Sequence, residues 1–262
     1  MKKHCLLWLL AVLFETQPLQ AIREYHGGQT LYVWAVSGLT LRTEPEFKAD
    51  KILSLPYGTA VTVQTDKQFE GIDTSEIELA TIPPYRLHDR NYSGYKIPGQ
   101  WVKVTAQGKT GFVFDGYLCI YPPARQVTDG SRKFAAEDWD GYLDRVFKIA
   151  CTSPMDTMAG AFGGTMRLYK NGASCLIRPA GDGLSSRTFF LPRLSLEEGY
   201  LMANFFYGLD RQTNLPVENN GDGGPILLVE ATPHNLCFKT DGVDIRVGAV
   251  DGVVVLYAFF YC

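Results

Sequence analysis

The sequence contains 262 residues, of which 46% are hydrophobic and 13% aromatic, and it carries 25 Lys and Arg against 28 Asp and Glu. This composition is typical of a globular chain of one or two domains and excludes a disordered or collagen-like protein. A net charge of −3 and a pI near 5.8 leave no basic surface for a phosphate backbone, so we expect no nucleic-acid partner.

The first 21 residues have the pattern of a secretory signal peptide. Lys2 and Lys3 precede an apolar run over residues 6–14, and a small-residue motif ends at Ala21. The apolar run is too short to cross a hydrocarbon core of roughly 30 Å as a helix. We therefore expect cleavage after Ala21 and a periplasmic or extracellular protein without a stable membrane anchor.

Five cysteines remain after that cleavage, so at least one thiol stays unpaired within a single chain. An exported protein can form disulfides, but the spacing of these cysteines does not define their pairing. The alternative, that several are small buried hydrophobic residues, stays equally open. The five are Cys119, Cys151, Cys175, Cys237 and Cys262.

Residues 31–121 consist of short β-prone runs separated by turn residues, as in the runs 32–36, 60–63 and 111–114. Runs of about four to six residues at this spacing predict a small barrel or sandwich. Two prolines and a polar stretch follow this region, and they predict a linker over residues 122–133.

Three stretches of this region resemble the bacterial SH3-like (SH3b) domain. Residues 37–45 (SGLTLRTEP) are similar to its opening Gly-Leu-x-hydrophobic-Arg-x-x-Pro signature, and residues 52–63 (ILSLPYGTAVTV) to its next hairpin. The segments 101–104 (WVKV) and 108–113 (GKTGFV) resemble its closing hairpin. The resemblance implies a small β-barrel that binds cell-wall peptides or docks to a partner protein.

Alternating apolar residues independently predict the core of this barrel, because every second side chain of a strand points to the same face. Glycines at positions 58, 108 and 111 suit turns that require a positive φ. The expected core residues are Leu39, Leu41, Leu55, Val61, Val63, Val102 and Val104.

An insertion over residues 65–100 departs from the SH3b pattern and is rich in tyrosine. Tyrosine provides rigid amphipathic contact area, so a loop of this kind can form a recognition surface. The alternative is a surface hairpin whose tyrosines pack on the barrel. The candidate binding residues in and around the insertion are Tyr57, Tyr85, Tyr92, Tyr95, Trp101 and Tyr117.

Residues 134–262 predict an α+β domain of unknown family. Apolar residues from Trp139 to Ala150 recur at helical spacing, and a capping-box pattern at Ser195 predicts the start of a second helix. Asn171-Gly172 separates two β-prone runs and predicts a hairpin.

The end of the chain predicts a three-stranded antiparallel meander over residues 236–261, with turns at Asp241-Gly242 and Asp251-Gly252. In this register Cys237 lies opposite Arg246, so a disulfide from Cys237 to Cys262 would require a different pairing. The last strand, residues 253–261 (VVVLYAFFY), is apolar on both faces, which predicts that both faces are covered. The fold class is thus mainly β: a small SH3-like β-barrel, then an α+β domain with a C-terminal antiparallel meander.

No motif in the sequence predicts catalysis, a metal or a cofactor. Cys151 is expected at the end of a helix, where the helix dipole disfavours a thiolate. His234 and Cys237 are three residues apart, a spacing that points them to opposite sides of a strand. The acidic residues Asp138, Asp140 and Asp144 have the spacing of a solvated helix face. We therefore predict no catalytic residue and no bound metal or cofactor.

The sequence therefore predicts an exported, non-catalytic binding protein whose SH3b-like module docks to a cell-envelope ligand, either a cell-wall peptide or a partner protein. One alternative is an envelope hydrolase with its active site in the C-terminal domain, involving Cys151 or carboxylates. A second is a periplasmic inhibitor or immunity-type protein, which an acidic surface and a tyrosine-rich loop would suit. The identity of the ligand and the oligomeric state are open.

Overall fold

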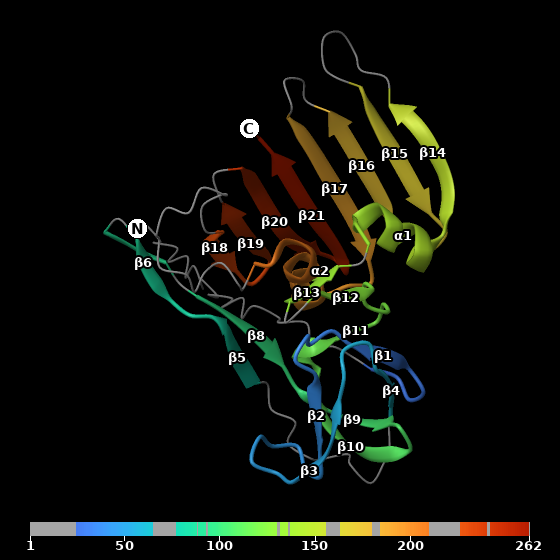
Figure 1. The fold of residues 1–262 in the computed structure, drawn as a ribbon, viewed down its shortest axis with the longest axis vertical. Coiled ribbons are helices and arrows are strands. Elements are labelled where there is room, and N and C mark those ends of the chain that lie inside the picture. Colours follow the sequence, from blue (N-terminus) through green and yellow to red (C-terminus); the bar gives the residue numbers. More distant parts are fainter. Residues whose placement is uncertain are drawn as a thin grey trace, which may run out of the picture.

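The computed structural model describes residues 25–64, 77–87, 89–92, 94–129, 132–135, 137–155, 163–179, 184–209, 226–239 and 242–261. This part of the chain is mainly β, with antiparallel sheets and two α-helices (Figure 1). Neither α-helix has the length and apolar character needed to cross a membrane. The predicted signal peptide and Cys262 lie outside the described residues.

The N-terminal half forms a seven-stranded antiparallel sheet in the order β11-β1-β4-β9-β10-β2-β3. Among the described residues this sheet is open, with β11 and β3 at its edges, so the closed barrel is not observed. A short 3-10 helix, η2 (Asp115–Tyr117), joins β10 to β11. The strands are β1 (Thr30–Val33), β2 (Leu39–Arg42), β3 (Lys51–Leu55), β4 (Ala60–Val63), β9 (Trp101–Ala106), β10 (Lys109–Phe114) and β11 (Leu118–Cys119).

The predicted core of this half is confirmed. Six of the seven expected residues are buried in one hydrophobic cluster, and Leu39 packs against that cluster while half-buried. Val102 and Val104 face this cluster from β9, whereas Trp101 faces the opposite side and joins a second cluster. Alternation along β9 thus places side chains in two different cores.

The glycine predictions are correct at two positions and wrong at the third. Gly58 and Gly108 have φ values of +85° and +74°, which a residue with a Cβ rarely adopts. Gly111 instead lies within β10. A Cβ there would be 2.5 Å from the backbone oxygen of Arg42, so Gly111 permits the close approach of β2.

The described part of the insertion is an antiparallel arm rather than an irregular loop. It begins as the pair β5 (Ile77–Ile82) and β8 (Tyr95–Gly99), and it continues as the pair β6 (Tyr85–Leu87) and β7 (Arg90–Tyr92). The arm extends from the smaller sheet towards β18 of the larger sheet, which lies above it in Figure 1.

The C-terminal half forms an eight-stranded antiparallel sheet in the order β14-β15-β16-β17-β21-β20-β19-β18. The predicted hairpin at Asn171-Gly172 is confirmed, since β15 and β16 pair across it. The strands are β14 (Ile149–Met155), β15 (Gly164–Tyr169), β16 (Ser174–Pro179), β17 (Ser185–Pro192), β18 (Leu227–Thr232), β19 (Asn235–Lys239), β20 (Val243–Val250) and β21 (Val253–Phe260).

The predicted meander is confirmed as β19, β20 and β21, and its register pairs Cys237 with Arg246 and Arg246 with Tyr257. The turn between β20 and β21 has Asp251 and Gly252 at positive φ, as a two-residue hairpin turn requires. The other turn includes residues outside the described part. The four described cysteines, at positions 119, 151, 175 and 237, are free thiols.

Two helices cover one face of the larger sheet. Helix α1 (Trp139–Phe147) is shorter than predicted: Lys148 has φ 59°, and Ala150 and Cys151 lie in β14 instead of at a helix end. Helix α2 (Leu196–Tyr207) begins with the predicted capping box at Ser195. Gly199 lets α2 approach the sheet, since a Cβ there would be 2.6 Å from Val254.

The two halves share one hydrophobic cluster. Trp34, Tyr95 and Tyr121 from the N-terminal half are buried with Tyr142 and Tyr200 of the helices. The segment 122–133, predicted as a linker, contains β12 (Gln126–Asp129), which pairs with β13 (Arg132–Ala135). The backbone oxygen of Pro122 accepts a hydrogen bond from Tyr142, so the connection itself contacts α1.

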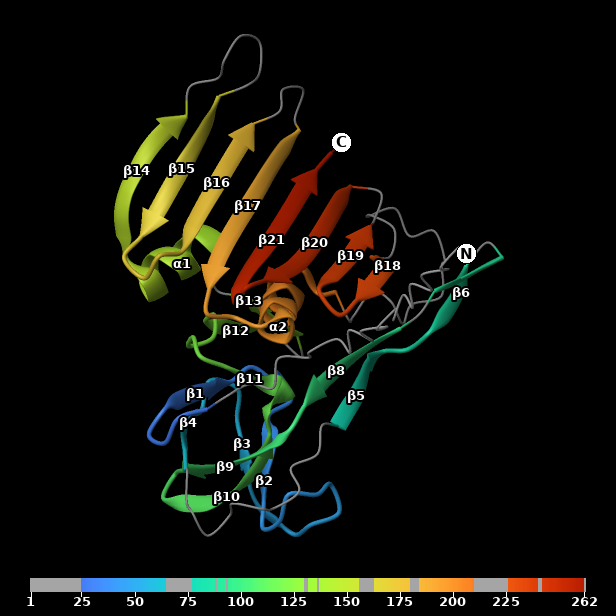
Figure 2. The same ribbon diagram turned by 180° about the vertical axis from the view of Figure 1, so that it is seen from behind.

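The prediction that both faces of the last strand are covered is wrong for the described structure. Val254, Leu256 and Ala258 are fully buried on the helix-covered face. Tyr257 and Phe259 on the other face are only half-buried, and no described element lies over them (Figure 2). One layer of helices is sufficient to bury one face of an antiparallel sheet.

Candidate functional site

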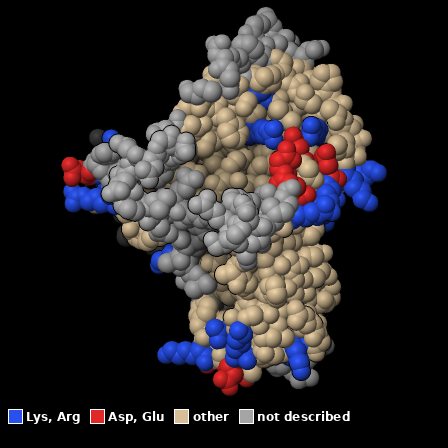
Figure 3. All heavy atoms as spheres, viewed as in Figure 1, with Lys and Arg blue, Asp and Glu red and all other residues tan. Residues whose placement is uncertain are grey.

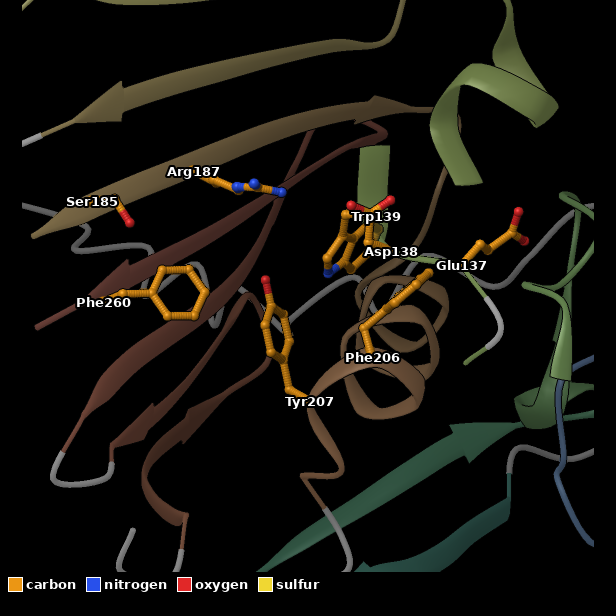
Figure 4. A pocket seen from close by; sticks show the side chains of 8 residues that line it. All are labelled: Glu137, Asp138, Trp139, Ser185, Arg187, Phe206, Tyr207 and Phe260. Atoms are coloured by element: carbon orange, nitrogen blue, oxygen red, sulfur yellow. The ribbon is translucent and has the colours of Figure 1, made fainter. Parts of the chain in front are cut away.

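A cavity of about 540 Å³ lies on the helix-covered face of the larger sheet, beside the end of α2 and the start of α1 (Figure 4). Its volume is in the range of small-molecule sites. Strands β17 and β21 form one wall and the two helices form the other. The residues that line it are Glu137, Asp138, Trp139, Ser185, Arg187, Phe206, Tyr207 and Phe260.

The start of α1 places Trp139 in the cavity. Asp138 caps the helix by accepting a hydrogen bond of 2.8 Å from the backbone N–H of Gly141. The indole of Trp139 then stacks on Phe206 at 4.1 Å and on Phe189 at 4.7 Å between ring centroids. These aromatic contacts fix the orientation of the indole at the cavity wall.

The end of α2 places Tyr207 opposite that indole. Gly208 follows in a left-handed conformation and ends the helix, so Tyr207 is its last residue. The Tyr207 hydroxyl and the Trp139 indole nitrogen face one another in Figure 4. Both atoms are buried, and neither reaches hydrogen-bond geometry with any described residue. A buried polar group without a partner is costly, so the Tyr207 hydroxyl proton is the donor that a ligand would satisfy, while the Trp139 indole beside it acts on the hydroxyl and lowers its pKa.

Burial raises the pKa of Tyr207 well above its ordinary value, and Arg187 and Trp139 lower it only in part. Tyr207 thus stays protonated near neutral pH and can act as a hydrogen-bond donor. Burial also raises the pKa of the neighbouring Cys175 thiol to about 12. That thiol is therefore protonated as well, which disfavours it as a nucleophile.

Arg187 supplies the positive charge of the cavity. Asp140 of α1 pairs with both Arg187, at 3.5 Å, and Arg167, at 3.4 Å. One carboxylate therefore faces two guanidinium groups, and Asp144 of the same helix acts electrostatically on Arg167 as well, so the acidic and basic groups of this cluster balance. Figure 3 shows acidic and basic side chains gathered beside one another over the region of α1.

The acidic residues at the rim already have partners. Glu137 forms an ion pair with Arg145, and a hydrogen bond from Arg145 is the main cause that lowers the pKa of Glu137. Asp138 is engaged as the helix cap. The Glu137 carboxylate is therefore ionised at neutral pH.

Chemically, the cavity combines four hydrogen-bond donors with aromatic walls. The donors are Arg187, Tyr207, Trp139 and the hydroxyl of Ser185, and rings of Phe206 and Phe260 lie beside them. This arrangement fits a small ligand with an anionic or strongly accepting group attached to a flat apolar part. Among the described residues no group of three His, Cys, Asp or Glu could hold a metal ion.

The six residues predicted to bind a ligand lie outside the cavity, and three of them contact the C-terminal half. Tyr95 and Trp101 are buried, with Tyr95 packed 4.9 Å from Tyr200. Tyr57 stacks on Phe205 of α2 at 5.4 Å. Its hydroxyl donates to the backbone oxygen of residue 124.

The remaining three are half-buried. Tyr85 and Tyr92 stack on one another at 4.8 Å, and the Tyr85 hydroxyl donates to the backbone oxygen of Leu228. Tyr117 lies 6.0 Å from Phe114. The structure therefore places Tyr57, Tyr85 and Tyr95 against the C-terminal half, and none of the six lines the cavity. Their role in binding stays a prediction.

The residues considered for thiol catalysis are far apart. Cys151 is exposed on β14, one edge of the larger sheet, and His234 lies in the turn between β18 and β19 at the other edge. At about 4.8 Å per strand the separation is roughly 30 Å along the sheet. Cys237 is buried, and burial raises the pKa of its thiol.

Sequence reasoning identified Trp139 only as part of a helix stripe, and it missed Arg187 and Tyr207. Arg187 lies on a strand that no pattern predicted, and Tyr207 ends a helix whose length the capping box does not define. An aromatic residue directly before a glycine that can end a helix was the signal that could have indicated Tyr207. No family model, no curated protein and no solved structure matches this chain.

Proposed function

We propose that this protein is an exported, non-catalytic binding protein of the cell envelope, and that it holds a small anionic ligand with an apolar part in the cavity between the helices and the larger sheet. The observation that carries the proposal is the buried Tyr207 hydroxyl, which has no partner in hydrogen-bond geometry among the described residues and lines the cavity together with Trp139 and Arg187. Folding rarely leaves such groups unpaired unless a ligand or water completes them.

In this proposal the N-terminal half is an SH3b-like module that docks to a cell-wall peptide or an envelope protein. Support comes from the sequence resemblance and from the way all seven strands of the smaller sheet contribute to one buried cluster. A sheet that surrounds a single core in this way is strongly curved. The module would bring the protein to the envelope, and the cavity would take the small ligand.

The cavity can be tested with 8-anilinonaphthalene-1-sulfonate, a fluorescent probe that joins an anionic group to aromatic rings. We expect saturable binding to the purified protein. Arg187→Gln should weaken binding about tenfold or more, since a hydrogen bond to a charged group contributes about 1.5–3 kcal/mol. Tyr207→Phe should weaken it a few-fold, as expected for a neutral hydrogen bond.

The matched control is Arg90→Gln, which removes the same charge from an exposed position on β7 of the arm. It should bind the probe as the unaltered protein does. Equal affinities for the unaltered protein and Arg187→Gln would refute the cavity as the binding site. Docking to the envelope is tested separately by co-sedimentation with purified peptidoglycan and by pull-down from an envelope extract. Binding in neither assay would refute that part of the proposal.

A further inference from the structure

Besides the cavity, a second candidate binding surface is the outer face of the larger sheet, opposite the helices. A groove of about 550 Å³ runs over this face, and Figure 2 views the sheet from this side. Half-exposed aromatic side chains on a sheet face mark an interaction surface. The residues lining the groove are Thr188, Asn235, Asp244, Arg246, Gly248, Val255, Tyr257 and Phe259.

The strand register arranges these side chains in rows across the sheet. Thr188, Tyr257 and Arg246 form one row across β17, β21 and β20. Val255 and Gly248 form the next row, and the absence of a side chain at Gly248 leaves a recess beside Val255. The floor of the groove therefore consists of strand residues, and the strand register fixes their positions.

Aromatic rings follow one another along β21. The ring planes of Tyr257 and Phe259 are within 4° of parallel at a centroid distance of 6.5 Å, and Tyr261 continues the row at 5.9 Å from Phe259. The C–H groups on the face of a sugar ring carry partial positive charge and are attracted to the negative faces of aromatic rings. A row of rings along one strand suits a ligand that repeats along its own length.

Hydrogen-bonding side chains lie beside this row on β20. Asp244 pairs with Lys239 at 3.6 Å and accepts a hydrogen bond from Tyr261 at 3.4 Å. Arg246 is exposed and has no carboxylate partner among the described residues. Arg246 therefore has a guanidinium available to a ligand, with Glu230 further along the same row across Cys237. A guanidinium binds a carboxylate through two parallel hydrogen bonds.

We propose that this groove binds a linear glycan that carries carboxylate groups. The sugar rings would stack on Tyr257 and Phe259, and a carboxylate would pair with Arg246. Sugar hydroxyls would donate to Asp244 and to the amide oxygen of Asn235, whose amide nitrogen already donates to Glu230. A second copy of this chain fits less well, because two copies related by a twofold axis would bring charged and polar groups of the groove into a dry interface. The site is on the opposite face from the cavity and does not depend on it.

Affinity electrophoresis tests the proposal with two carboxylated glycans, polygalacturonate and cell-wall glycan strands freed of peptides. We expect at least one of them to retard the protein, and dextran, a neutral glycan, to retard it less. Tyr257→Ala should weaken binding about tenfold or more, as for an aromatic anchor. Arg246→Gln should weaken it to a similar degree and remove the preference over dextran. Arg246 is exposed, so this variant leaves the core intact.

Two control variants change similar side chains elsewhere: Phe47→Ala removes an exposed aromatic ring near the smaller sheet, and Arg90→Gln removes a charge from the arm. Both should be retarded as the unaltered protein is. Failure of both carboxylated glycans to retard the protein would overturn the proposal, as would retardation that is insensitive to Arg246→Gln. If polyglutamate retards the protein as strongly as the glycans do, the binding is simple charge attraction, and the glycan proposal is overturned. If the protein is a dimer and Tyr257→Ala makes it a monomer, a second copy occupies the groove, which overturns the proposal as well.

Discussion

Glu198 offers the sharpest test of how the two halves are joined. Its side chain is 5% exposed. One carboxylate oxygen accepts a hydrogen bond of 2.9 Å from the backbone of Ser195, which completes the capping box of α2. The other accepts a bond of 3.0 Å from the backbone of Ile120, at the end of the smaller sheet. A single side chain thus connects the start of a helix in one half to the backbone of the other.

The magnitude follows from the groups that would lose their partner. Glu198→Ala leaves two backbone N–H groups without their acceptor, and a hydrogen bond to a charged group contributes about 1.5–3 kcal/mol. Removing the carboxylate also removes the cost of keeping it buried. We therefore expect the free energy of unfolding to fall by about 3 kcal/mol. Ser195→Ala removes only the other half of the capping box and should cost about 1 kcal/mol.

Denaturant unfolding followed by tryptophan fluorescence measures both variants, since Trp34 and Trp139 are buried in the cluster that the two halves share. We expect one transition for each, because a shared core couples the halves. If Glu198→Ala costs no more than Ser195→Ala, the bond to Ile120 contributes nothing and the reasoning about the junction is wrong. Two separate transitions in the unaltered protein would contradict it as well.

Four further predictions concern the core, the arm, the pH dependence and export. Val102→Ala should cost about 1–3 kcal/mol in a denaturant titration, and a loss below about 0.5 kcal/mol, typical of surface changes, would place Val102 outside the core. Tyr85→Phe should cost about 1 kcal/mol in the same assay, since it removes the bond to Leu228. Because the folded pKa of Glu137 is lowered from 4.5, its pair with Arg145 stabilises the fold above that value and is lost as the pH falls through the folded pKa. Glu137→Gln should therefore flatten the acid limb of a stability-against-pH curve, and an unchanged limb would contradict the pairing. Mass spectrometry of the exported protein should find Ile22 at its N-terminus, and a chain that keeps residues 1–21 would rule out cleavage there.

The elements that the sequence predicted correctly are those whose signal is local. The capping box at Ser195, the turn at Asp251-Gly252 and the alternation that buries Val102 each depend on residues close together in the chain. The predicted end of the first helix failed for a related reason. Ala150 continues the helical spacing, but the chain has already turned at Lys148 and entered a strand whose partner is β15.

Contacts between distant segments could not be predicted in this way. Gly111 was assigned to a turn because its role depends on the approach of β2, which is distant in sequence. The cavity is a similar case: Trp139, Arg187 and Tyr207 come from three elements, and only the packing of helices on the sheet brings them together. The composition and the spacing of residues along the chain do not show which distant elements will pack together.

The hydroxyl groups of the tyrosines separate residues that hold the fold from residues that remain available for a ligand. Tyr57, Tyr85 and Tyr142 each donate to a backbone oxygen, so a ligand that engaged these hydroxyls would first have to break a bond within the protein. Tyr207 has no such partner among the described residues and lines a cavity beside a guanidinium. Binding there adds a hydrogen bond without losing one. Tyr57 and Tyr85 therefore hold the two halves together, whereas the Tyr207 hydroxyl lines the cavity and can bind a ligand there.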